Sequence, residues 1–239
     1  MAVTFDSIKT GGGFPSNPTT ISGHALGFGS GNDRIVLVFV GTVGGTLPPT
    51  FITASYNGVA MNQLVQSYAT VFSSAWTSSV FYLLDSSLPS SAGSYDFQYQ
   101  TSGGPFDSKV AIISYIGASQ SVPLYTSSSL NEQNPAVSGT YSTNINLVSS
   151  AGMIVDNMVG LPSSTATGTP GASQTERADT GDADEIFFVS DKTFSSSGSN
   201  SMSWTPSTSY FCISHVLLEL AQTNGIPATD NAIIMGAAF

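Results

Sequence analysis

The sequence predicts an all-β protein built as an antiparallel two-sheet β-sandwich with little helix. Short segments rich in β-branched and aromatic residues recur along the chain, and clusters of Gly, Pro, Ser and Asn separate them. Asn57-Gly58 lies between two such segments and is a strong hairpin signal, because both residues of a type I′ turn need positive φ. A single all-β domain commonly reaches this length. We therefore expect one sandwich at 1–222 and an extended C-terminal arm at 223–239, with two small domains as the alternative.

The clearest predicted strand is Arg34-Ile-Val-Leu-Val-Phe-Val40, bounded by Asn32-Asp33 and Gly41. It is apolar on both faces, so we expect a neighbouring segment or another subunit to cover its outer side. Full burial of each large side chain contributes roughly 1.5 to 3 kcal/mol. A charge at Leu37 or Val38 is therefore expected to prevent folding.

In the first half of the chain, alternating patterns predict strands on either side of this core strand. Glycines and prolines at 11–18 predict a loop. The predicted strands are at 3–9, 21–26, 51–56, 59–65, 79–84, 94–101 and 109–116.

In the second half, residues 117–139 predict a long connection between sheets with one short strand at 124–127. Residues 161–181 are rich in Ser, Thr, Gly and Pro and predict an exposed loop. Residues 217–222 suggest a helical end to the last strand. The predicted strands are at 144–149, 153–159, 186–189, 201–204 and 210–220. Residues 152–160 weakly echo 32–41, a single internal similarity.

The chain contains few charges. Charged residues make up 8% of it, against roughly 25% in an average soluble domain, so polar uncharged side chains must cover the surface. Five basic and fifteen acidic residues give a net charge of −10, which disfavours nucleic acid as a partner. No segment approaches the roughly eighteen apolar residues of a membrane span, and the first residues lack a signal-peptide pattern. We expect a soluble chain made in the cytosol, with no membrane partner.

Residues capable of catalysis are scarce. His24 and His215 are the two histidines, and there is no Gly-x-Ser-x-Gly motif. We interpret both histidines as hydrogen-bonded structural groups and expect neither enzymatic activity nor a cofactor. Cys212 lies in an alternating strand pattern and is expected to be a buried, inert thiol.

The densest acidic segment, 176–185, offers one candidate metal site. Asp179, Asp182 and Asp184 could supply carboxylate oxygens to Ca²⁺ from one loop. We prefer a solvated acidic loop, because calcium also needs carbonyl ligands and fixed geometry that the segment does not indicate.

The aromatic residues allow two interpretations. They could form a sugar-stacking platform, but aromatics at alternating strand positions more often pack in a core or an interface. The residues concerned are Trp76, Trp204 and the tyrosines at 56, 68, 82, 95, 99, 115, 125, 141 and 210.

The last stretch of the sequence is apolar and nearly uncharged. Left exposed, it would form a contiguous apolar surface. We expect it to act as an assembly arm that docks on another subunit in an extended form. The apolar residues are Ile226, Ile233, Ile234, Met235 and Phe239.

Several motifs of strands and turns follow one another through most of residues 20–220. They are His24-x-Leu26-Gly27 with Asn32-Asp-Arg34, Tyr56-Asn-Gly-Val-Ala-Met61, Phe81-Tyr-Leu83 with Gly93-Ser-Tyr-Asp-Phe97, 110–117, 151–156 and 209–218. This succession resembles a β-sandwich family of bacteriophage virion proteins, whose domains also occur in bacterial surface proteins. The motifs mark strands and turns and no active site.

The resemblance implies a jelly-roll-like sandwich used for building or adhesion. The first expectation is a capsid decoration, or cement, protein on the outer surface of the virion. Such a protein would be a homotrimer that binds the major capsid protein and stabilises the head. The alternative is a receptor- or carbohydrate-binding module of a phage tail, a fibre or a bacterial surface protein. Long polar loops at 117–139 and 161–181 would then carry the binding.

Overall fold

The structure is a computed structural model that describes residues 1–13, 18–102 and 107–223. These residues form seventeen strands and one 3₁₀ turn, η1 (Asp85–Ser87). Every strand pairing within them is antiparallel. The all-β sandwich prediction is confirmed, although the strands of the described residues form four sheets instead of the expected two.

The first half of the chain forms two of these sheets. The inner N sheet contains, in spatial order, β1 (Thr4–Gly12), β9 (Asp107–Ile116), β3 (Ile35–Val43), β7 (Ser74–Leu84) and β6 (Asn62–Val71). The outer N sheet contains β2 (Thr19–Leu26), β8 (Gly93–Ser102), β4 (Thr50–Tyr56) and β5 (Val59–Ala60).

The second half forms the other two. The inner C sheet contains β10 (Leu124–Leu130), β17 (Tyr210–Ala221), β12 (Gly152–Pro162), β15 (Ile186–Phe194) and β14 (Thr175–Asp179). The outer C sheet contains β11 (Tyr141–Leu147), β16 (Gly198–Pro206) and β13 (Gly168–Pro170).

Both halves follow the same strand order. In the inner sheets the first strand of each half lies beside the last, β1 beside β9 and β10 beside β17, and the third strand, β3 or β12, flanks that pair. In the outer sheets the second strand lies beside the next to last, β2 beside β8 and β11 beside β16. This double Greek-key order is that of a jelly roll. The described chain is therefore two jelly rolls in tandem, and the outer sheet of the second has fewer strands.

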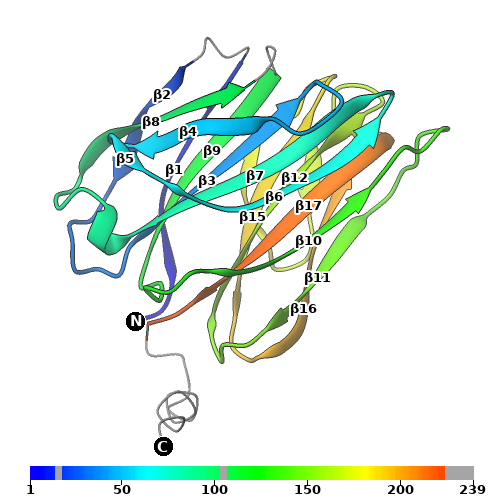
Figure 1. Cartoon of the computed structure of the whole chain (residues 1–239). Helices are drawn as coiled ribbons and strands as arrows, with labels where there is room; N and C mark the ends of the chain where they lie inside the picture. Colours follow the sequence, from blue (N-terminus) through cyan, green and yellow to red (C-terminus); the bar gives the residue numbers. More distant parts are fainter. Residues whose placement is uncertain (14–17, 103–106, 224–239) are drawn as a thin grey trace, which may run out of the picture.

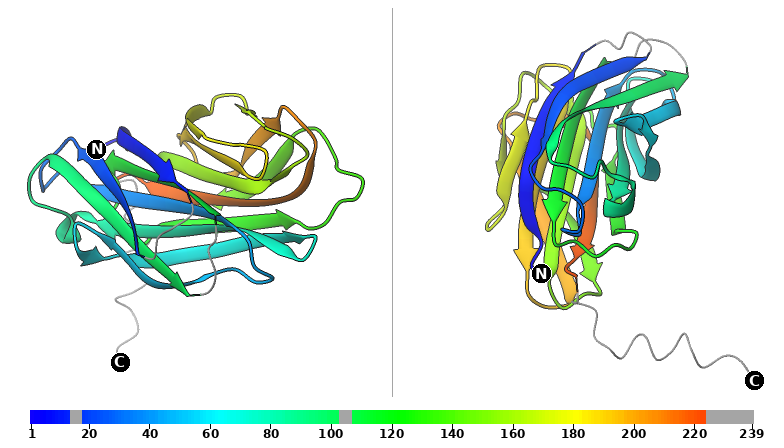
Figure 2. Two further views of the ribbon diagram at one scale, coloured as in Figure 1. Left: turned by 90° about the horizontal axis from the view of Figure 1, so that it is seen from above. Right: turned by 90° about the vertical axis from the view of Figure 1, so that its left-hand side faces the viewer.

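The four sheets stack in the order outer N, inner N, inner C and outer C (Figures 1 and 2). The largest apolar cluster lies between the two inner sheets and includes Phe39, Val155, Phe187 and Leu218. Separate clusters fill the space between the sheets of each half. The two halves thus share a continuous apolar core.

This stacking explains the core strand. Within β3, Ile35, Leu37 and Phe39 face the inner C sheet, whereas Val36, Val38 and Val40 face the outer N sheet. Both faces of β3 are covered by the protein's own chain. This confirms the expectation that a neighbouring segment covers its outer side; the alternative was another subunit. The internal echo at 152–160 falls on β12, which holds the same place in the second half as β3 does in the first.

The hairpin prediction is confirmed, since β4 and β5 flank Asn57 and Gly58 with φ of 49° and 77°. Two other local predictions are wrong. The expected loop at 161–181 contains β13 and β14, which are short edge strands and need no long apolar pattern. The expected helical end at 217–222 is strand through Ala221, because β10 and β12 pair with β17 on both sides.

The last described residue, Thr223, lies close to the start of the chain. The amino group of Met1 donates a hydrogen bond to the Thr223 carbonyl oxygen over 3.1 Å, and the Thr223 hydroxyl donates to Asp33 Oδ2 over 2.8 Å. The apolar residues of the expected arm, Ile226 to Phe239, lie outside the described residues.

Candidate functional site

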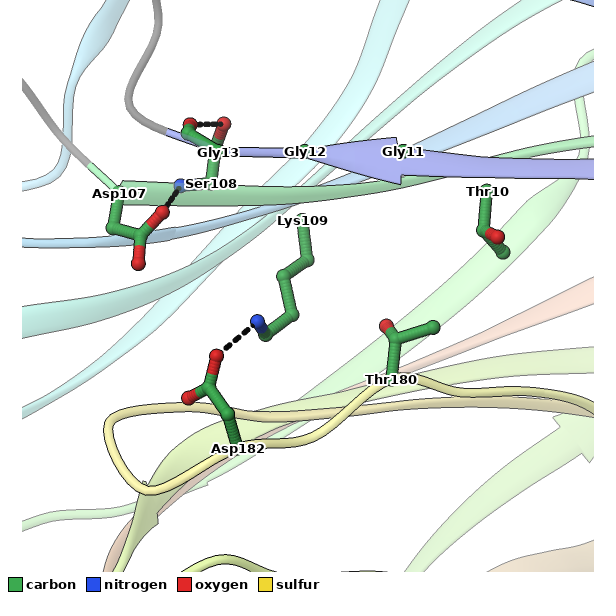
Figure 3. A pocket seen from close by; sticks show the side chains of 9 residues that line it. All are labelled: Thr10, Gly11, Gly12, Gly13, Asp107, Ser108, Lys109, Thr180 and Asp182. Carbon is green, nitrogen blue, oxygen red and sulfur yellow. Dashed lines mark hydrogen bonds and ion pairs between the residues drawn. The ribbon is translucent and has the colours of Figure 1, made fainter.

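A pocket of about 420 Å³ opens where the two halves meet (Figure 3). The C-terminal end of β1 and the start of β9 form one side of the pocket, and the connection from β14 to β15 forms the other. A Cβ at Gly12 would clash with the Ser108 carbonyl oxygen, so glycine allows β1 to end this close to β9. The lining residues are Thr10, Gly11, Gly12, Gly13, Asp107, Ser108, Lys109, Thr180 and Asp182. We call this site the interface pocket.

An ion pair between the halves crosses the pocket. Lys109 of β9 and Asp182 of the β14–β15 connection point toward one another, and the ammonium donates to Asp182 Oδ2. Burial alone would raise the pKa of Asp182, but the Lys109 ammonium and the backbone N–H groups of Asp184 and Glu185 hold it below its usual value. Burial likewise opposes the Lys109 charge, yet the surrounding carboxylates raise its pKa. The pair therefore stays charged at neutral pH.

Glu185 lies behind this ion pair and is fully buried. Neither of its carboxyl oxygens has a hydrogen-bond partner among the described residues. Burial raises its pKa well above the usual value; the Lys109 charge opposes the shift, while Asp107 and Asp182 add to it. A Cβ at Gly41 would lie 2.5 Å from Glu185 Oε1, so glycine on β3 makes room for this carboxyl. Burial between the halves thus favours the neutral, protonated form of this carboxyl.

The interface pocket offers no obvious catalytic arrangement. The Ser108 hydroxyl lies 2.6 Å from the Tyr99 hydroxyl and donates to the Gly13 carbonyl oxygen over 3.0 Å. Asp107, Asp182 and Lys109 line the pocket, but the Ser108 hydroxyl bonds to the Tyr99 hydroxyl and the Gly13 carbonyl oxygen and to neither carboxylate. We interpret the pocket as a junction between the halves.

The three aspartates of the calcium hypothesis have different partners. Asp179 Oδ2 accepts a 2.9 Å hydrogen bond from the Gly168 N–H, whereas Asp182 pairs with Lys109. The Asp184 backbone carbonyl oxygen accepts from Trp76 Nε1 over 3.0 Å. Within the described ranges, no group of three or more His, Cys, Asp or Glu residues is arranged to hold a metal ion.

His215 belongs to a buried polar network between the sheets of the second half. Asp156 Oδ2 lies 3.0 Å from His215 Nε2 and accepts from Trp204 Nε1 over 3.0 Å. Asp156 Oδ1 accepts from the N–H and the hydroxyl of Ser190 over 2.8 and 2.6 Å. These residues match the types of a catalytic triad, but the serine bonds to the aspartate and not to the histidine. All four are buried, so the network is structural.

His24 is also buried, and it contacts side chains of neighbouring strands. Its ring nitrogens lie 2.7 Å from the Tyr56 hydroxyl and 3.0 Å from the Ser7 hydroxyl. Burial lowers the pKa of His24 from 6.5 to about 4, although the Asp6 carboxylate and a hydrogen bond at Ser7 oppose the shift. Cys212 is buried and free, as expected, and burial raises its pKa from 9.0 to about 12.

A second pocket, of about 580 Å³, lies on the outer N sheet. β4, β5, β8 and the start of β6 supply most of its lining. Its side chains are uncharged and include three glutamines, Gln63, Gln98 and Gln100. Sequence reasoning missed this site, which we call the amide groove, and placed ligand binding in the loops at 117–139 and 161–181. The only sequence signal was the alternation from Phe97 to Gln100, which directs the two glutamines to one face.

The fold defines the described chain as two jelly rolls in tandem, with buried polar groups between their sheets. No family model matches the sequence, and no curated protein matches it. Among solved structures, a chain in the 3.5 Å cryo-EM structure of the Sputnik virophage is similar, with 8% sequence identity and a TM-score of 0.21. The match covers 100% of this chain and 91% of the virophage chain. Values this low establish neither a shared fold nor a shared function. None of the helical segments in the described part has the length and hydrophobicity to span a bilayer.

Proposed function

We propose that this chain is a non-enzymatic structural protein of a virus particle, specifically a bacteriophage capsid decoration (cement) protein that stabilises the head by binding the capsid lattice. The observation that carries the proposal is the tandem pair of jelly rolls joined by one core. Jelly rolls recur in viral capsids and in lectin domains. This is an argument by fold analogy, to which the surface adds support.

The described surface exposes apolar side chains along one edge of the stack. The edge strands β6 and β10 lie side by side there, since Thr70 bonds to both Asn131 and Glu132, which follow β10. Edge strands and large apolar side chains are common features of contact surfaces. The exposed residues on and beside these strands are Tyr68, Phe72, Val122, Leu124 and Tyr125.

The non-enzymatic part of the proposal rests on the titratable groups. Both histidines and Cys212 are buried, and the pKa values of His24 and Cys212 are shifted away from the range useful for acid–base or nucleophilic chemistry near neutral pH. A hydrolase screen of the purified protein would contradict this part if it detected activity that His24→Ala or His215→Ala removed.

Addition of the purified protein to undecorated phage capsids tests the main proposal. We expect saturable co-sedimentation with the capsids, density at fixed lattice positions by cryo-EM and a rise in the capsid disruption temperature. Mass photometry of the free protein measures its oligomeric state, for which we propose a homotrimer. Failure to bind any phage capsid lattice would refute the decoration role.

The amide groove favours a second candidate function, a receptor- or carbohydrate-binding module of a tail, a fibre or a bacterial surface protein. In that case the protein would bind a glycan without affinity for capsids. The chemistry of the groove is argued below.

A further inference from the structure

The outer N sheet presents a polar, uncharged face to solvent. Phe97 and Tyr99 of β8 point into the core, so Gln98 and Gln100 point outward between them. On the neighbouring strand β4, Ser55 lies opposite Gln98 and Thr53 lies opposite Gln100. Two amides and two hydroxyls thus stand side by side on one face.

The amides of the groove have no hydrogen-bond partner among the residues that the structure describes. Gln63, Gln98 and Gln100 have no side-chain hydrogen bond to any described residue. By contrast, the side chains of Gln66, Gln120 and Gln174 bond to backbone or side-chain groups of the protein. Each free amide offers a carbonyl acceptor and two N–H donors. The groove therefore concentrates hydrogen-bonding capacity that the fold leaves to a ligand or to water.

An apolar surface adjoins these amides. Ile52 is exposed, and Phe51 and Met61 are half-buried lining residues that pack against the core between the sheets. Phe51 lies edge to face on the buried Phe81 beneath it, with ring centroids 4.8 Å apart. A bulge in β4 between Phe51 and Thr53 accompanies the outward exposure of Ile52. Apolar walls with a few convergent polar groups are typical of small-molecule sites.

The kind of ligand follows from these two properties. None of the lining residues is charged, so the groove gives an anion or a cation no counter-charge. The strand that carries Gln98 and Gln100, β8, has no free backbone edge for an added peptide strand, because it is paired with β2 and β4. A peptide added along the unpaired edge of β4, from Thr50 to Thr53, would be held by backbone hydrogen bonds and not by these amides. A neutral sugar has hydroxyls that bond to amides and a C–H face that packs on apolar and aromatic side chains.

We infer that the amide groove on the outer N sheet is a binding site for a neutral oligosaccharide. The inference deepens the second proposed function by locating its site and naming its ligand class. It does not depend on capsid attachment, because the groove meets β6 only at its start, whereas β6 contacts the segment after β10 at Thr70, near its other end.

The test is titration calorimetry of the full chain with four probes: maltohexaose, cellohexaose, xylohexaose and N-acetylchitohexaose. We expect at least one probe to bind saturably. The affinity of the Gln98→Ala/Gln100→Ala double variant for that probe should be lower than that of the wild type by about tenfold or more. Asn146→Ala is the matched control, since Asn146 is an exposed amide on β11 of the outer C sheet and should leave affinity unchanged.

Two outcomes would overturn the inference: no binding of any probe, or binding that the double variant leaves intact. Gln98 is exposed and Gln100 is half-buried without a side-chain hydrogen bond to a described residue, so we expect the double variant to melt close to the wild-type temperature. An unchanged melting temperature would show that any lost affinity is not caused by lost folding. Co-sedimentation of the same variants with capsids separates this inference from the decoration role. Loss of sugar binding with intact capsid binding would support both.

Discussion

The Ser78 hydroxyl donates a 2.5 Å hydrogen bond to Asn157 Oδ1, and this contact joins β7 of the first half to β12 of the second. It lies between the inner sheets, where the surrounding side chains are mostly apolar. Asn157 Nδ2 also donates to the Phe188 carbonyl oxygen over 3.1 Å. The amide is thus satisfied on both sides in a fully buried position.

Ser78→Ala should destabilise the protein by about 1 to 3 kcal/mol, because it leaves the Asn157 oxygen buried without a donor. Urea unfolding measures the change. Ser142→Ala, at an exposed position of β11, should change stability by less than about 0.5 kcal/mol. Equal effects of the two variants would contradict a role for this bond in joining the halves.

Glu185→Gln should change how stability depends on pH. The folded-state pKa of Glu185 lies above its usual value of 4.5, so the folded protein retains a proton that the unfolded chain releases. The stability linked to this proton is fully present below pH 4.5 and is lost as pH rises through the folded pKa. The variant cannot ionise, so its stability relative to wild type should increase across that range. Parallel stability curves from urea unfolding between pH 4 and 8 would show that Glu185 does not carry this linkage.

Protonation of His24 should lower the stability of the folded protein at acid pH. Its pKa is lowered from 6.5 in the unfolded chain to about 4 in the fold, so stability is lost as pH falls from 6.5 toward 4. The loss amounts to as much as about 3 kcal/mol, at 1.36 kcal/mol for each pKa unit. His24→Gln should be less stable at pH 7 but should lose less on acidification. Titration of the His24 ring protons by NMR measures the pKa directly, and a midpoint near 6.5 would contradict the prediction.

A charge in the core strand should abolish folding. Leu37→Asp would place a carboxylate between the two halves, and Val38→Asp would place one between the sheets of the first half. Both variants should lack the near-ultraviolet circular dichroism of the wild type. Thr20→Asp, at an exposed position of β2, is the control and should retain it.

Deletion of residues 224–239 tests the proposed assembly arm. The truncated protein should keep the far-ultraviolet spectrum of the β-sandwich and should associate or attach to particles less strongly. Unfolding of the truncated protein would place the segment in the core of its own chain. Unchanged assembly by mass photometry and unchanged capsid binding would refute the arm.

Most strands could be predicted from sequence because alternation and turn residues are local properties. The number of sheets was not predicted correctly, although two segments of the sequence carry part of the information needed for it. Ile35 to Val40 are apolar on both faces, and so are several neighbouring positions of β12. Two doubly covered strands at equivalent places require four layers. One such strand, considered alone, is equally compatible with cover by another subunit.

The sites depended on contacts between distant parts of the chain and were harder to predict. Asp156 is buried because Trp204 and His215 lie over it, and each comes from a strand well separated in sequence. Nothing local to Glu185 indicates that it enters the core between the halves. Gln98 and Gln100 alternate as expected, but their free amides become a groove only when β4 and the start of β6 lie beside them.

The hydrogen bond between the Met1 amino group and the Thr223 carbonyl oxygen has a consequence for chain connectivity. The beginning of the first jelly roll and the end of the second lie side by side, so a short linker between them would close the described backbone into a ring. Opening that ring at 119–123, between β9 and β10, would give a circular permutant in which the second jelly roll is synthesised first. We expect the permutant to keep the arrangement of the two jelly rolls, because the apolar contacts between their inner sheets do not depend on the order of translation.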